Sequence, residues 1–190
     1  MKVVNCPQCG SKINYQVDDK MLRCDYCHSS LVLEAVSKKI ALQIPLNSKL
    51  LIHRQRYHIE NITQWLYSEG IRAEYLLIND MNQQYVLSKD DENVSLVKVV
   101  DFDKKSSNKS LDWNSLQPNT DVIINDCQWL VTEKRRMIGY ANKEFFYTYL
   151  TGKNAELLIF IFSSLTEDSL LETRQGFWLN SFDIKLKCNK

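Results

Sequence analysis

The chain has 190 residues, of which 44% are hydrophobic and 25% are charged, enough for one ordinary domain core and a small additional module. Its 24 Lys and Arg residues against 23 Asp and Glu give a net charge of +1, which excludes a general attraction to nucleic acid or anionic lipid. The longest apolar run, 157–162, is far shorter than the ~20 residues that cross a bilayer, so no membrane span is expected.

The first residues, 1–5, run directly into a cysteine motif without an apolar signal segment, which predicts a cytoplasmic protein. Thiols stay reduced in that compartment, and paired cysteines there favour a metal over a disulfide. Two of the six cysteines, Cys127 and Cys188, lie far from the motif and are expected to be plain buried or half-buried thiols.

The other four cysteines form two C-x2-C pairs, Cys6 with Cys9 and Cys24 with Cys27. A two-residue spacer lets one tight turn aim both sulfurs of a pair at the same ion. Four thiolates are a common ligand set of tetrahedral zinc, so the motif predicts one Zn²⁺. Because four thiolates leave no coordination position open, the ion is expected to be structural and not catalytic.

Three other interpretations of the motif remain open. The cysteines could be a dithiol redox pair, or they could hold iron in a rubredoxin-type centre, which uses similar turns. His28 could also be a ligand, but its place next to Cys27 is poor for sharing the ion. His28 follows Cys27 in the second pair as Gly10 follows Cys9 in the first. The favoured interpretation is therefore that His28 is a turn residue with positive φ.

Residues 1–34 are predicted to form this zinc ribbon. Alternating apolar and polar residues over 12–17 indicate a strand, and 20–23 returns as a second strand after a tight turn. So short a segment buries too little surface to fold alone, so the metal has to hold it together. The charged stretch 35–40 is predicted to be a linker.

Residues 41–190 show weak self-similarity. When the chain is shifted by 72 residues, apolar and turn positions coincide in three segments: 47–59 with 119–131, 75–78 with 147–150, and 85–87 with 157–159. Each copy predicts a strand, a tight polar turn, a strand, a longer polar excursion and two more strands. The excursions are expected at 63–70 and 134–143.

The predicted fold class is therefore mainly β. An N-terminal zinc ribbon is followed by a β-rich domain of two pseudo-repeated small barrel-like or meander units. Unit one is expected at about 44–100 and unit two at about 116–188.

A family resemblance rests on the ribbon pattern Cys-Pro-x-Cys-Gly…Cys-x-Tyr-Cys and on three segments of the β domain: 47–59, 74–77 with 85–87, and 129–134. In these features the chain resembles bacterial proteins that carry a domain of unknown function of the 4178 family. The resemblance covers nearly the whole chain. It implies a bacterial accessory protein with a zinc ribbon, similar to proteins encoded near small membrane proteins and polyamine-synthase-like enzymes, and it carries over no catalytic residues. The chain departs from the family pattern in lacking turn glycines near Arg54 and Asp126 and in having His28 after Cys27.

Two basic clusters are candidates for anion sites. The hairpin from His53 to His58 carries His53, Arg54, Arg56 and His58, and 134–136 reads Lys-Arg-Arg. The favoured interpretation is that both clusters are solvated hairpin tips and not anion sites. Most aromatic residues are expected in the core, as is usual in β-rich proteins.

Three functions follow. The leading one is a non-catalytic adaptor in which the ribbon and the β units bind a protein partner. The first alternative is nucleic-acid binding, and the second is a small-ligand binder or enzyme with a site between the two β units. Catalysis is disfavoured because the chain has three histidines, no Gly-rich phosphate loop and no nucleophile elbow.

Overall fold

The computed structural model describes residues 2–33, 44, 48–68, 70–89, 93–104, 107, 111–166, 169–180 and 183–187. The predicted linker 35–40 and Cys188 lie outside these ranges. The predicted domain boundary at 34 and 41 therefore stays a prediction.

The described residues are mainly β structure, which confirms the predicted fold class. The strands are β1 (Lys2–Asn5), β2 (Lys12–Tyr15), β3 (Met21–Arg23), β4 (Ser30–Val32), β5 (Lys49–Ile52), β6 (Gln55–Tyr67), β7 (Gly70–Asn79), β8 (Gln84–Lys89), β9 (Val94–Val99), β10 (Asp121–Ile124), β11 (Cys127–Ile138), β12 (Glu144–Thr151), β13 (Glu156–Phe162), β14 (Leu170–Leu179) and β15 (Ile184–Lys187). Short 3-10 turns, η2 (Tyr140–Asn142) and η3 (Lys153–Ala155), connect β11 to β12 and β12 to β13.

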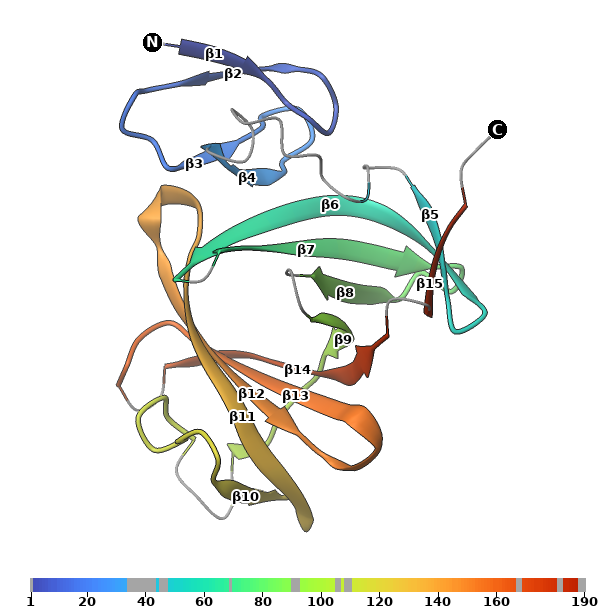
Figure 1. Cartoon of the computed structure of the whole chain (residues 1–190), viewed down its shortest axis with the longest axis vertical. Coiled ribbons are helices and arrows are strands. Elements are labelled where there is room, and N and C mark those ends of the chain that lie inside the picture. The colour runs from blue at the N-terminus through green and yellow to red at the C-terminus, as the bar shows by residue number, and fades with distance from the viewer. Residues whose placement is uncertain are drawn as a thin grey trace.

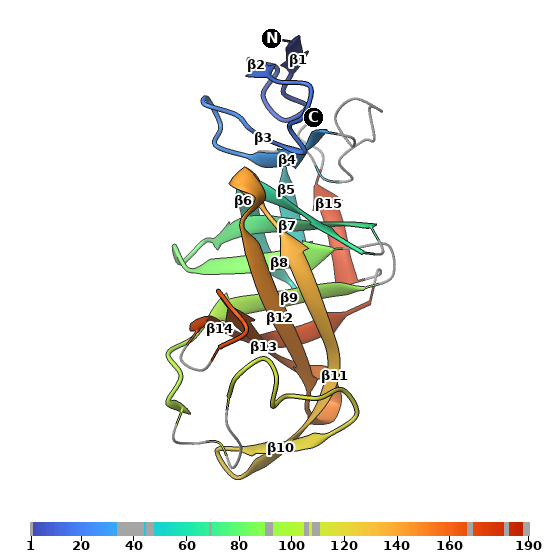
Figure 2. The same ribbon diagram turned by 90° about the vertical axis from the view of Figure 1, so that its left-hand side faces the viewer.

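The N-terminal ribbon consists of two small antiparallel hairpins, β1–β2 and β3–β4. It lies at one end of the molecule, above β6 and the turn between β11 and β12 (Figures 1 and 2). Its own core contains Ile13, Leu22 and Leu31, together with two of the cysteines. This cluster is small, which agrees with the prediction that a metal holds the segment together.

The remaining chain forms a closed ring of antiparallel strands. Within the described residues, the pairing order is β6, β7, β8, β9, β14, β13, β12 and β11. The pair Leu66 and Ile138 then joins β11 back to β6 and closes the ring into a barrel. The strands β5 and β15 extend the sheet beyond β6, and β10 extends it beyond β11.

Side-chain alternation divides the apolar residues of the barrel into separate cores. In β12, Phe146 and Leu150 point into a cluster that belongs to the second half of the chain. Tyr147 and Tyr149, between them in sequence, point into the interior of the ring. A third cluster, which includes Leu50, belongs to the first half. In β12 and β13 runs of consecutive residues are buried, so these two strands are covered on both faces.

The two halves of the barrel match in strand position. The strands β10, β11 and β13 begin 72 residues after β5, β6 and β8, respectively. Both hairpin turns use positive φ without glycine, at His53 and Arg54 (47° and 67°) and at Asn125 and Asp126 (49° and 59°). The halves nevertheless continue into one sheet, because β9 pairs with β14. The division into two pseudo-repeated units stays a prediction.

The predicted excursions at 63–70 and 134–143 are wrong in their first parts, 63–67 and 134–138, which are strand. The strand β6 continues to Tyr67, and β11 continues to Ile138. In β6 the alternation is hidden because both faces are covered. Trp65 points into the ring, while Leu66 contacts the ribbon.

Gly176 in β14 occupies a position where the backbones of two strands approach closely. A Cβ atom at this residue would lie 1.9 Å from the carbonyl oxygen of Leu96 in β9. No side chain fits at that distance, and the obstacle is backbone. Glycine here allows β14 to join the two halves of the sheet.

We expect Gly176→Ala to lower the free energy of unfolding by about 3 kcal/mol, the upper part of the range for overpacking, because β9 or β14 must shift. The measurement is a urea titration monitored by circular dichroism. Ser95→Ala, on β9 but without a backbone clash, is the control. An unchanged unfolding midpoint for Gly176→Ala would show that the backbones of β9 and β14 are farther apart at this position than described.

Candidate metal centre

Two tight turns place the four cysteines. The N–H of Gly10 donates to the carbonyl of Cys6 at 2.9 Å, and the N–H of His28 donates to the carbonyl of Cys24 at 2.8 Å. Gly10 and His28 both have positive φ, 78° and 57°. His28 thus takes the turn position expected from the sequence. Its side chain is exposed and lies outside the group of candidate ligand atoms.

The four sulfur atoms lie within 4.8 Å of one another. Cys6 Sγ is 3.8 Å from Cys27 Sγ, and Cys9 Sγ is 3.6 Å from Cys24 Sγ. Sulfurs bound at 2.3 Å around a tetrahedral ion stand about 3.8 Å apart, so the spacing fits a metal held by four thiolates. A disulfide would need about 2.05 Å, and the cysteines are free.

The sulfurs differ in their protonation. Burial raises the pKa of the Cys6 thiol to about 12, and burial also raises the pKa of Cys27. Burial acts in the same direction on Cys24, but the N–H groups of Cys27 and Tyr26 and the hydroxyl of Ser11 outweigh it and lower the pKa of Cys24 to about 6. A metal would therefore meet a ready thiolate at Cys24 and displace the protons of Cys6 and Cys27.

The ligand set determines what this centre can do. Four thiolates complete a tetrahedron and leave no position for water or substrate. In the part of the chain that the structure describes, no other group of three or more His, Cys, Asp or Glu side chains is placed to hold an ion. The centre is suited to holding the ribbon together.

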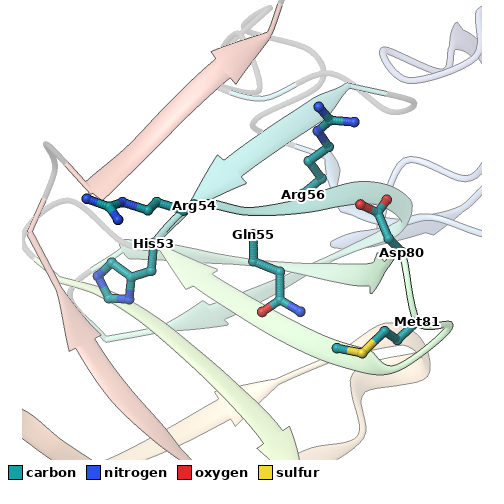
Figure 3. A pocket seen from close by; sticks show the side chains of 6 residues that line it. All are labelled: His53, Arg54, Gln55, Arg56, Asp80 and Met81. Atoms are coloured by element: carbon teal, nitrogen blue, oxygen red, sulfur yellow. The ribbon is translucent and has the colours of Figure 1, made fainter.

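The basic hairpin between β5 and β6 borders a shallow depression of about 370 Å³, lined by His53, Arg54, Gln55, Arg56, Asp80 and Met81. The side chains of Arg54 and Arg56 project in different directions (Figure 3). His53 Nε2 lies 3.7 Å from Asp183 Oδ1. The two guanidinium groups do not converge on one point, which supports the reading as a solvated tip.

The second basic cluster is used within the protein. Lys134 Nζ lies 4.2 Å from the centre of the Trp113 ring. Arg135 pairs with Glu133, and Arg136 pairs with Glu144. These cations are matched by neighbours, so the cluster does not form an anion site.

The ring interior contains a buried ionic cluster that the sequence did not reveal. Arg174 Nη1 donates to Glu74 Oε1 at 2.9 Å, and Arg72 Nε lies 3.8 Å from the same oxygen. The Arg72 guanidinium is 5.2 Å from the centre of the Tyr149 ring. The only available signal was two charged residues, Arg72 and Glu74, at alternate positions of a strand that is otherwise mainly apolar.

Cys127 departs from the expectation of a buried or half-buried thiol. It is exposed because it directly follows the tight turn of the β10–β11 hairpin, beyond the edge of the apolar core. It takes no part in the cluster of four.

Comparison with protein-family models, with curated proteins and with solved structures gave no match. No helix in the described ranges has the length and apolar character needed to cross a membrane.

Proposed function

We propose that this protein is a non-catalytic cytoplasmic adaptor whose ribbon is built on one structural Zn²⁺, and that it belongs to the bacterial 4178 family named above. The closed set of four thiolates supports a structural ion. The ribbon sequence and the matched strand positions of the two barrel halves support the family. We propose zinc and not iron because zinc is the usual ion of structural sites with four thiolates. Elemental analysis of the purified chain tests this.

The observation that carries the adaptor role is the position of Tyr26. This residue lies between two metal ligands, Cys24 and Cys27, and is 77% exposed. Val3 and Val17, at 56% and 70%, add exposed apolar surface to the same ribbon. A tyrosine on a rigid turn loses little conformational entropy on binding, and tyrosine is enriched at the energetic centres of protein interfaces.

The test is affinity capture from extracts of the source cell, with the zinc-loaded full chain as bait, in parallel with and without nuclease. We expect Tyr26→Ala to lose the captured protein, because a central tyrosine commonly contributes 2 kcal/mol or more, about a thirtyfold change in affinity. Leu171→Ala, which truncates a similarly exposed side chain (58%) on the barrel, is the control and should retain it.

Equal capture by the wild type and Tyr26→Ala would reject the ribbon as the contact surface. Capture that disappears on nuclease treatment would instead favour the nucleic-acid alternative.

A further inference from the structure

The ribbon lies on the barrel where its ring of strands closes. In the described residues this closure consists of one pair, Leu66 of β6 with Ile138 of β11. The neighbouring strands β6 and β7, in contrast, pair over ten residues. We call the junction of β6 and β11 the seam. It has the least backbone pairing of any junction in the ring, so it depends on side chains for support.

On one side of the seam, the ribbon packs apolar side chains onto β6 and β7. Met21 and Val32 are buried, and Leu66 and Ile71 pack against them. These two ribbon residues do not belong to the ribbon's own core. Their burial therefore depends on contact with the barrel, and Leu66 is itself one of the two seam residues.

Hydrogen bonds fix the ribbon to the same strand. The N–H of Val32 donates to Gln64 Oε1 at 2.8 Å, and Gln64 is only 5% exposed. Ser30 of β4 pairs in parallel with Thr63 of β6. Separation would replace this hydrogen bond by hydrogen bonds to water, so the bond opposes separation by the small net difference between the two.

On the other side of the seam, the ribbon reaches the turn between β11 and β12. The guanidinium of Arg23 lies 6.0 Å from the centre of the Tyr140 ring. Beneath this turn, Trp65 of β6 packs on Gly139, where a Cβ atom would be 2.6 Å from the indole ring. The ribbon thus contacts β6 and the turn that follows β11, and both views of the molecule place it above these two elements (Figures 1 and 2).

We propose that the ribbon is a metal-dependent clamp on this seam. With the metal bound, Met21 and Val32 hold Leu66 beside Ile138, and the ring stays closed. When the metal is removed, the ribbon unfolds and the seam opens locally, while the other strand junctions stay paired. The state of the four cysteines then controls solvent access to the barrel interior, where Trp65 and the ionic cluster lie.

The metal dependence follows from the difference in size between the core of the ribbon and the cores of the barrel. The ribbon is too small to keep its shape without the ion, whereas the barrel has large cores of its own. Removing the ion therefore unfolds the part of the ribbon that packs on β6 and β7, while the barrel remains stabilised by its own cores. Segments with few buried contacts are the ones that open locally.

The test is hydrogen exchange of the full chain, followed by mass spectrometry, with zinc bound and after chelation. We expect those amides of 63–67 and 136–138 that do not bond to β7 or β12 to exchange at least about tenfold faster without zinc, because only these amides face the opened seam. Amides of β13 should be unchanged. Met21→Ala with Val32→Ala should cause the same change at the seam with zinc still bound.

Two further variants make the result decisive. Val3→Ala with Val17→Ala removes as many apolar side chains from exposed positions of the ribbon and should leave the seam unchanged. Leu66→Cys with Ile138→Cys places thiols at directly paired positions, a separation that suits a disulfide. Once oxidised, it should keep the seam closed after chelation.

Equal exchange at the seam with and without zinc, while ribbon amides lose protection, would overturn the clamp. A uniform increase over all barrel strands would also overturn it, since that would be a general loss of stability.

Discussion

Replacing Cys24 and Cys27 with serine is expected to reduce bound metal from one ion per chain to none and to unfold the ribbon. Two of four ligands are lost, and in zinc-finger peptides the metal contributes on the order of 10–16 kcal/mol, which is effectively folding free energy. Residues 41–190 should keep their own thermal transition, because the barrel cores do not include the ribbon's core residues. Elemental analysis and amide exchange over 2–33 measure the two effects.

Cys127→Ser is the matched control for this experiment. It removes an exposed thiol that lies outside the cluster of four, so metal content and ribbon protection should both be unchanged. Retention of the metal by the double serine variant would refute the cluster as the site. Loss of the barrel transition would refute the division into ribbon and barrel domains.

The ribbon could be predicted from sequence because its chemistry is local. Ligand type and spacing alone indicate the centre, and a single residue, His28, was correctly placed by analogy with Gly10 in the other turn. The positive φ of His53 and Arg54 shows the limit of such reasoning, because a hairpin turn formed there without the glycine that usually marks it.

The barrel could be predicted only in part, because its closure depends on contacts between distant residues. The hairpins are local and were found, but the pairing of β9 with β14 and of Leu66 with Ile138 has no local signal. The end of β6 was misread for a related reason. A strand covered by the ring interior on one face and by the ribbon on the other loses the simple alternation that identifies strands.

The ionic cluster in the ring interior was also beyond prediction, since Glu74 and Arg174 are a hundred residues apart. Glu74 is 5% exposed and accepts hydrogen bonds from Arg174 and from the Ser88 hydroxyl, the latter at 3.3 Å. Burial by itself raises the pKa of Glu74. The nearby charges of Arg174 and Arg72 outweigh burial, so the pKa lies below its ordinary value and the carboxylate is ionised.

Glu74→Gln is therefore expected to destabilise the barrel by about 3–5 kcal/mol, because it removes the carboxylate that both buried guanidinium groups share and leaves Arg174 with its pair to Glu172 alone. Urea unfolding at neutral pH measures this effect. Glu144→Gln is the control, since it breaks an exposed pair with Arg136 that water screens, and its midpoint should hardly change. A midpoint for Glu74→Gln equal to that of the control would mean that the interior is hydrated.

Acidity should remove the difference between the wild type and Glu74→Gln. A carboxyl whose pKa is lower in the folded state contributes its full stability above the unfolded pKa, about 4.3 for Glu, and loses it as pH falls through the folded pKa. The wild type should therefore lose stability faster than the variant below about pH 4.3, and the two unfolding midpoints should converge. Parallel curves down to the acid transition would show that Glu74 is not the ionised partner of Arg72 and Arg174.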